Sequence, residues 1–205
     1  MADDVEFTAK DLEIIRDASP KTSVQLSCGS FYVNSFDGRR YGYEALGKKL
    51  TDLFGLMCPP YFLVEVDYFG STVEVVVSKD LNELGVFLTF YDLSILFLYS
   101  EDQSIPLDIS LYFIWYVMEE KYPCSVKNRI DVIKMFIFDI LFRNDDRHFN
   151  NFGLLFKPDG GIDVVAFDHE QTFNCGDNCQ KIAAGFEEYC VPMKENLTKF
   201  LIQSS

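Results

Sequence analysis

Two short polar stretches contain the residues best suited to chemistry, and both histidines of the chain lie in them. The first covers residues 144–151 and reads Asn-Asp-Asp-Arg-His-Phe-Asn-Asn, and the second covers residues 167–170 and reads Phe-Asp-His-Glu. Carboxylate and carboxamide oxygens bind divalent metal ions, and a carboxylate can also orient a hydroxyl nucleophile. The two stretches together therefore indicate phosphoryl transfer from a nucleotide.

Phosphoryl transfer requires a group that orients the attacking hydroxyl, ligands for a metal at the phosphates, and cations that hold the phosphates. Asp146 suits the first role because it follows a long apolar segment, and His148 would hold the loop or contact a phosphate. Asn151 and Asp168 suit the second role, since Mg²⁺ prefers oxygen ligands. The alternative is structural, because the same residue types also cap helix ends and form turns.

The segments around the motif predict how these residues are positioned. Residues 126–142 are apolar nearly all round and predict a buried helix that ends at the motif. Residues 152–156 and 162–167 predict two short strands, joined by the turn sequence Lys-Pro-Asp-Gly-Gly at residues 157–161. This hairpin would return Asp168 to the neighbourhood of Asn151.

The earlier part of the chain predicts strands around one helix, followed by a helical region. A break in the pattern at residues 78–81 predicts a hinge between two lobes. Strands are predicted at residues 22–26, 31–36, 61–68 and 72–77, and helices at residues 43–54 and 109–120.

The motif at residues 144–153 resembles the catalytic loop of HipA-type serine/threonine kinases, and phosphatidylinositol kinases have a similar Asp-Arg-His-x-x-Asn string. The resemblance implies that Asp146 is the catalytic base and that Asn151 binds metal. It also implies that Asp168 chelates metal, like the Asp of Asp-Phe-Gly in ordinary protein kinases. A lipid or small-molecule acceptor stays open on this resemblance, although no basic or amphipathic membrane segment is present.

The resemblance continues through the N-terminal third. Residues 18–24 are similar to the phosphate-covering loop and its following lysine, which implies that Lys21 contacts phosphates. Glu44 stands near the start of the first helix, where the family commonly has a Glu. Ser78 and Asp80 stand where the adenine-binding hinge would lie. One departure is Asn34, which occupies the strand position where family members usually carry a lysine.

We therefore expect an α+β, two-lobed protein-kinase-like fold of the HipA type. The N-lobe would cover residues 1–80, with an antiparallel sheet and one helix, and a small helical C-lobe would cover residues 81–205. The expected activity is ATP- and Mg²⁺-dependent transfer to a Ser/Thr hydroxyl of a protein substrate. The alternatives are a pseudokinase with little turnover, favoured by Asn34, and a toxin-antitoxin component that associates with an antitoxin or other partner subunit.

A formal net charge of −14 over 205 residues disfavours nucleic acid as a partner, because the chain would repel a phosphate backbone. No apolar run is long and charge-free enough to span a bilayer, and the acidic N-terminus lacks the apolar core of a signal peptide. We expect a cytoplasmic protein with reduced cysteines. Cys175 and Cys179 would require two further ligands to bind zinc, so they are interpreted as loop cysteines.

Overall fold

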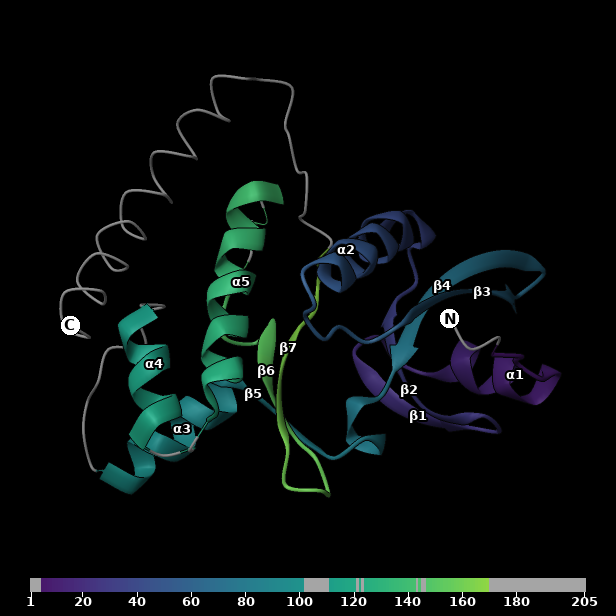
Figure 1. The fold of residues 1–205 in the computed structure, drawn as a ribbon. Coiled ribbons are helices and arrows are strands. Elements are labelled where there is room, and N and C mark those ends of the chain that lie inside the picture. Colours follow the sequence, from purple (N-terminus) through teal and green to yellow (C-terminus); the bar gives the residue numbers. More distant parts are fainter. Residues whose placement is uncertain are drawn as a thin grey trace.

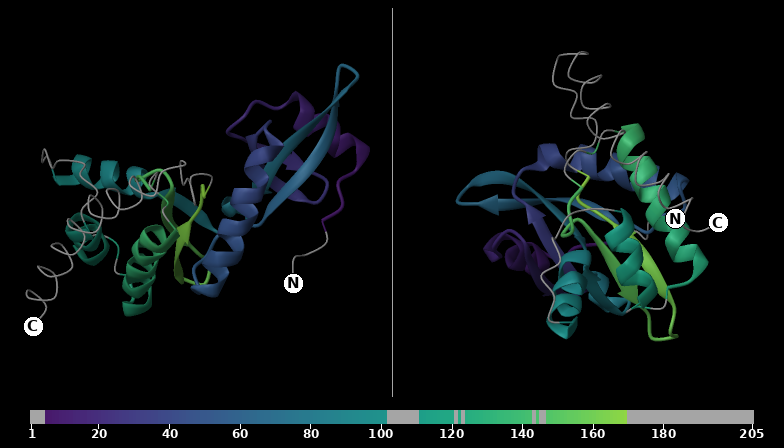
Figure 2. Two further views of the ribbon diagram at one scale, coloured as in Figure 1. Left: turned by 90° about the horizontal axis from the view of Figure 1, so that it is seen from above. Right: turned by 90° about the vertical axis from the view of Figure 1, so that its left-hand side faces the viewer.

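The computed structural model describes residues 5–101, 111–120, 122, 124–142, 144 and 147–169. In these residues, five α-helices and two antiparallel sheets form a mixed α+β architecture (Figure 1). The elements up to residue 79 lie at one end of the molecule, and the later helices lie at the other (Figure 2).

The first sheet contains four antiparallel strands in the order β1-β2-β4-β3. Its strands are β1 (Thr22–Leu26), β2 (Gly29–Ser35), β3 (Tyr61–Tyr68) and β4 (Ser71–Lys79). Alternate residues of these strands point to one face, where the buried cluster includes Phe31, Val33, Val64, Val75 and Val77. The sequence predicts all four strands to within two residues at each end, because apolar residues and turn signals alternate clearly here.

Two helices accompany this sheet, whereas the sequence pattern indicates only one. The predicted helix is α2 (Tyr41–Leu53), and the additional one is α1 (Ala9–Asp17). A capping box starts α1: Thr8 Oγ1 accepts a hydrogen bond from the N–H of Asp11, and Asp11 Oδ2 accepts one from the N–H of Thr8. Periodicity does not reveal α1 because its buried residues are only Asp11 and Ile15.

The second sheet has the order β5-β6-β7 and is accompanied by three helices. The elements are β5 (Val86–Thr89), α3 (Phe90–Glu101), α4 (Leu111–Glu120), α5 (Val126–Phe142), β6 (Phe152–Phe156) and β7 (Ile162–Ala166). The sequence predicts α4, α5, β6 and β7. It misses β5, which is only four residues long, and α3, whose apolar residues show no helical period. None of the helices in the described ranges has both the length and the hydropathy for a membrane span.

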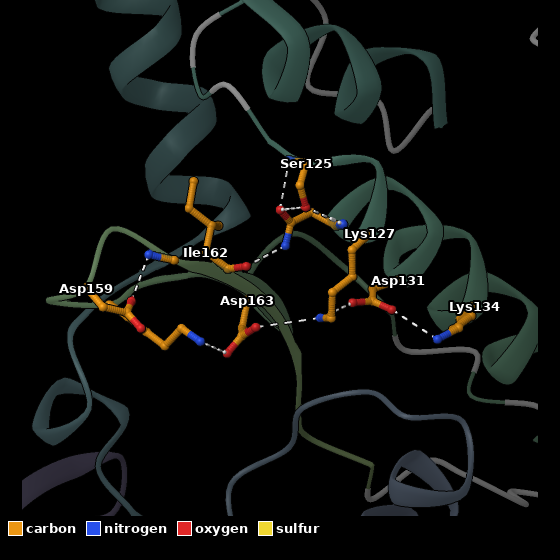
Figure 3. Close-up of polar contacts among 10 residues, drawn as sticks. Ser125, Lys127, Asp131, Lys134, Asp159, Ile162 and Asp163 are labelled. Atoms are coloured by element: carbon orange, nitrogen blue, oxygen red, sulfur yellow. Dashed lines mark hydrogen bonds and ion pairs between the residues drawn. The ribbon is translucent and has the colours of Figure 1, made fainter.

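Contacts shown in Figure 3 hold the β6–β7 hairpin against α5. Asn128 Nδ2 donates a hydrogen bond of 2.5 Å to the carbonyl of Ile162. Lys127 Nζ lies 2.7 Å from Asp131 Oδ2 on the same helix and 3.6 Å from Asp163 Oδ1 on β7. These contacts fix the hairpin whose two ends carry the predicted metal ligands.

The two sheets are connected beside this hairpin. Met57, between α2 and β3, forms a parallel bridge with Val165, and the N–H of Ala166 donates to the carbonyl of Met57 at 3.0 Å. The chain also passes from β4 to β5 over residues 80–85. The predicted boundary between lobes of residues 1–80 and 81–205 falls in this connection, and the division itself stays a prediction.

Candidate active site

A cleft of about 640 Å³ is lined by residues from both sheets and from the loops that join them. Six of the seven residues predicted for the site line this cleft: Lys21, Ser78, Asp80, His148, Asn151 and Asp168. The seventh is Asp146, the predicted catalytic base, which lies outside the described residues. The fold therefore brings the ends of the predicted motifs together, although they are far apart in sequence.

Lys21, just before β1, and Asp168, just after β7, approach each other in this cleft. Lys21 Nζ lies 3.8 Å from Asp168 Oδ2. The other carboxylate oxygen, Asp168 Oδ1, is buried and has no hydrogen-bond partner among the described residues. Asp168 also has a φ of 58°, which is uncommon for a residue other than glycine. Because a buried carboxylate oxygen without a partner is unfavourable, Asp168 Oδ1 is suited to a cation.

The hairpin brings the backbone of Asn151 beside that of Phe167, the residue before Asp168. Phe152 pairs with Ala166, and the N–H of Phe167 donates to the carbonyl of Asn151 at 3.1 Å. The N–H of Asn151 in turn donates to the carbonyl of His148 at 2.9 Å. Asn151 is 3% exposed and lines the cleft. The turn predicted at residues 157–161 is thus confirmed, and it sets Asn151 and Asp168 at neighbouring strand ends.

Arg147 is the centre of a buried network behind the two hairpin ends. Its guanidinium lies 3.0 Å from Asp139 Oδ2, where Asp139 stands on the last turn of α5. It also donates hydrogen bonds to the carbonyls of Asn151 and Phe167. Burial raises the pKa of Asp139, and the positive charge of Arg147 opposes that rise. Arg147 therefore fixes the loop after α5 to both α5 and the hairpin.

Two side chains from the first half of the fold hold the backbone around Asp168. Tyr61 Oη accepts a hydrogen bond of 3.2 Å from the N–H of Asp168, and Glu44 Oε2 accepts one of 2.9 Å from the N–H of His169. Burial and the charge of Glu44 raise the pKa of Tyr61 well above its usual value, so its hydroxyl stays protonated. The sequence offers no signal for Tyr61, because only the folded structure brings it to residue 168.

Asn34 is located in the cleft, at the strand position where the resemblance implies a lysine. Its Nδ2 donates hydrogen bonds to Ser78 Oγ at 3.0 Å and to the carbonyl of Tyr32 at 3.2 Å. Ser78 is buried, so its contact with Asn34 links β2 to β4. Asn34 supplies no positive charge, and Lys21 is the cation whose ammonium approaches Asp168.

Asp80 organises the connection that follows β4. Its Oδ1 accepts a hydrogen bond from the N–H of Asn82 at 2.9 Å, which caps a short 3₁₀ turn, η2 (Leu81–Glu83). Its Oδ2 accepts a hydrogen bond of 2.5 Å from the hydroxyl of Ser23 on β1. Asp80 therefore shapes the cleft wall at the predicted hinge.

The oxygen donors of Asn151 and Asp168 suit Mg²⁺ better than they suit a metal ion that is bound by protein side chains alone. In the described ranges, no group of three or more His, Cys, Asp or Glu side chains is placed to bind a metal ion. Mg²⁺ needs no such group, because it keeps several waters and commonly uses one or two protein oxygens together with substrate phosphates. Asp168 Oδ1 and the Asn151 amide match that pattern, and the predicted loop cysteines Cys175 and Cys179 lie outside the described residues.

Comparisons with known proteins give a match in fold but none in sequence. No protein-family model and no curated protein matches the chain. A crystal structure of the Helicobacter pylori proinflammatory kinase CtkA is similar in fold, with a TM-score of 0.58 and 18% sequence identity. The match covers 83% of this chain and 62% of that chain, so this chain spans less than two thirds of its length. The predicted α+β, kinase-like fold is confirmed, whereas membership in the HipA-type family stays a prediction.

Proposed function

We propose that the chain binds ATP with Mg²⁺ in the cleft and transfers the terminal phosphoryl group to a serine or threonine hydroxyl of a protein. The observation that supports this most is the convergence of Lys21, Asn151 and Asp168 on one cleft within a kinase-like fold. The unpartnered Asp168 Oδ1 adds a place for a cation among these residues.

Each residue has a distinct role in this proposal. Asn151 and Asp168 would hold Mg²⁺, which neutralises phosphate charge when bound. Lys21 exchanges its contact with Asp168 for the phosphates, since its side chain is more than half exposed and free to move. His148 faces the same cleft, where its ring would contact a phosphate. Ser78 and Asp80 form the wall where the base of the nucleotide would bind.

The chemical step is a direct displacement in this proposal. The acceptor oxygen forms a bond to the γ-phosphorus while the bond from that phosphorus to the β–γ bridging oxygen breaks. The proton of the acceptor hydroxyl passes to the carboxylate of Asp146, and ADP leaves with the electron pair of the broken bond. The protein mainly positions the reactants and stabilises their charge, as phosphoryl transfer requires.

Two measurements test the proposal together. Thermal unfolding with ATP, with and without Mg²⁺, should show stabilisation of about 2.7 kcal/mol when ligand exceeds its Kd a hundredfold. Incubation with γ-labelled ATP and Mg²⁺ should then label the protein, and Asp146→Ala should abolish the label while retaining the thermal shift. If ATP with Mg²⁺ leaves the unfolding temperature unchanged, the proposed function is wrong.

A pseudokinase is the second candidate, and Asn34 is the observation that favours it. A neutral side chain bonded to Ser78 stands where a lysine would hold the phosphates. In that case ATP would still stabilise the protein, but wild-type protein and the Asp146→Ala variant would show equal, background labelling. Association with an antitoxin or another partner subunit is compatible with both candidates, and co-purification from the native operon would test it.

A further inference from the structure

Outside the cleft, the tip of the β3–β4 hairpin carries an aromatic residue that the fold does not explain. Tyr68 pairs with Ser71, so Phe69 and Gly70 form a two-residue turn, with φ values of 53° and 81°. A turn with positive φ at both central positions favours Asn-Gly, Asp-Gly or Gly-Gly, because a bulky side chain is strained there. The hairpin ends at a projecting tip (Figure 2), and Phe69 is 94% exposed. Its ring is therefore neither required by the turn nor buried in the core.

Phe69 is held in a defined position beside a second exposed aromatic ring. The rings of Phe69 and Tyr68 pack edge to face, with their centroids 4.9 Å apart, and Tyr68 is also exposed. Asp67 Oδ1 accepts a hydrogen bond of 2.8 Å from the N–H of Gly70, which fixes the turn. Aromatic side chains that are already ordered lose little conformational entropy on binding, so these two rings are suited to anchor a partner.

The two rings belong to the lining of a groove of about 920 Å³. Phe36, after β2, and Val73, on β4, add apolar surface, and both also pack against the core of the first sheet. The end of α1 and residues 18–20, just before Lys21, complete the lining. None of the described residues that line this groove also lines the cleft. The groove is therefore a second concave surface, whose apolar side chains continue the core towards solvent.

Carboxylates outnumber cations around the groove. Asp17 lines it and accepts hydrogen bonds of 2.7 and 3.2 Å from the Arg16 guanidinium. Asp17, and more weakly Glu13 and Asp67, raise the pKa of Arg16, so all three carboxylates act on this one charge. Arg16 is the only cation among the described residues that line the groove. The surface therefore repels an acidic segment and attracts a basic one.

We propose that this groove is a docking site for a segment of another protein in which an apolar anchor side chain is flanked by Lys or Arg. The anchor packs against Phe69 and Tyr68, and the flanking cations face Asp17, Glu13 and Asp67. A second copy of this chain fits less well, because a net charge of −14 makes two copies repel each other. The inference does not rest on the proposed function, since the groove is separate from the cleft.

The binding test uses the full chain and three mixtures of short synthetic peptides. The first mixture has a central Phe or Leu flanked by random Lys and Arg, the second has Asp and Glu flanks, and the third has Lys and Arg around a central Ser. Fluorescence anisotropy measures each affinity. We expect the first mixture to bind about tenfold more tightly than either of the others, because only it combines an apolar anchor with basic flanks. Its affinity should fall as salt is added, since the charges around the groove are exposed.

Phe69→Asn separates docking from folding. Asn-Gly suits this turn better than Phe-Gly, so the variant should raise the urea midpoint of unfolding above that of the wild type. The same variant should weaken binding of the first mixture by about tenfold, because the anchor loses its aromatic contact. Leu53→Asn is the control, since Leu53 is an exposed apolar residue at the end of α2 and does not line the groove. It should bind the peptides as the wild type does.

Glu13→Gln tests the contribution of charge. Glu13 is exposed on α1, so this variant should unfold like the wild type. We expect it to weaken binding of the first mixture by about threefold at low salt, because one attractive charge is removed. Lys10→Gln is the matched control, since Lys10 is exposed on the same helix and carries the opposite charge. It should not weaken binding.

Several results would overturn the inference. They are failure of the first mixture to bind the wild type, equal binding of the second or third mixture, and full binding in Phe69→Asn. Unchanged binding in Glu13→Gln at low salt would show that charge does not select the partner. Self-association of the wild type in sedimentation velocity, abolished by Phe69→Asn, would assign the surface to a second copy instead. A Phe69→Asn protein that is less stable than the wild type would show that the ring serves the fold.

Discussion

Asn34 Nδ2 donates a hydrogen bond of 3.0 Å to Ser78 Oγ, which links two strands at the wall of the cleft. HipA-type kinases usually carry a lysine on this strand, so a neutral contact stands where a cation would face the phosphates. Lys21 lies in the same cleft, with its ammonium 3.8 Å from Asp168 Oδ2. Under the proposed function, Lys21 in the loop before β1 would therefore supply the cation that such kinases carry on the second strand.

The first prediction follows from this exchange. Lys21→Gln should weaken ATP binding in Mg²⁺ by about tenfold, because a charge-assisted contact to the phosphates is lost. Asn34→Lys in the same chain should restore most of the affinity, since it returns the charge to the usual strand. Calorimetric titration of both variants measures this. Lys10→Gln is the control, because Lys10 is exposed on α1 and does not line the cleft.

Two results would contradict this prediction, one in the single variant and one in the double variant. If Lys21→Gln binds like wild type, Lys21 does not contact the phosphates. If Lys21→Gln weakens ATP binding but adding Asn34→Lys restores no affinity, a positive charge at position 34 cannot do the work of the charge at position 21. The first result removes Lys21 from the phosphates, and the second shows that a lysine at position 34 does not replace it.

The residues whose roles could be predicted from sequence are those set by local patterns. The turn at residues 157–161 predicts the hairpin that brings Asn151 towards Asp168. The apolar residues of α5 predict a helix buried nearly all round, but only one face is buried, and Ile130 and Leu141 are exposed on the other. The roles of Tyr61 and Glu44 depend on hydrogen bonds between residues 107 and 125 positions apart. No local pattern encodes such contacts. Short elements such as β5 and α1 were also missed, since each buries too few apolar residues to show a period.

The second prediction concerns the buried pair formed by Arg147 and Asp139. Arg147→Met should lower the free energy of unfolding by about 3–5 kcal/mol, because it leaves the Asp139 carboxylate buried without its cation. Combining it with Asp139→Leu should recover part of the loss, since neither charge is then buried. Urea unfolding of the two variants measures both effects. A double variant as unstable as Arg147→Met would show that the carbonyl contacts of Arg147 matter more than its ion pair.

The third prediction concerns Tyr61. Tyr61→Phe removes the acceptor for the N–H of Asp168 but keeps the aromatic ring in place. We expect a loss of about 1 kcal/mol in the free energy of unfolding, with a smaller Mg²⁺-dependent gain in ATP affinity. Tyr68→Phe is a matched control, because Tyr68 is an exposed tyrosine on the same strand. Equal stability and equal Mg²⁺ dependence in the two variants would show that the Tyr61 hydroxyl does not hold Asp168.

The fourth prediction is a pH dependence located far from the cleft. Hydrogen bonds from Ser27 and Thr8 hold the pKa of Asp11 well below its usual value. A carboxylate whose folded pKa is lowered stabilises the fold above its unfolded pKa of about 3.9, and this contribution is lost as the pH falls further. Asp11→Asn should therefore be less stable than wild type at pH 7, and the difference should shrink below about pH 4.

Urea unfolding between pH 7 and pH 3 tests the Asp11 contribution. Glu13→Gln is the control, because Glu13 is an exposed carboxylate on the same helix. We expect Glu13→Gln to follow the wild-type curve at every pH. The Asp11→Asn curve should lie below the wild-type curve at pH 7 and approach it towards pH 3 without meeting it, because the folded pKa of Asp11 lies lower still. A constant difference between Asp11→Asn and wild type across this range would mean that hydrogen-bond geometry, and not the charge of Asp11, stabilises the start of α1.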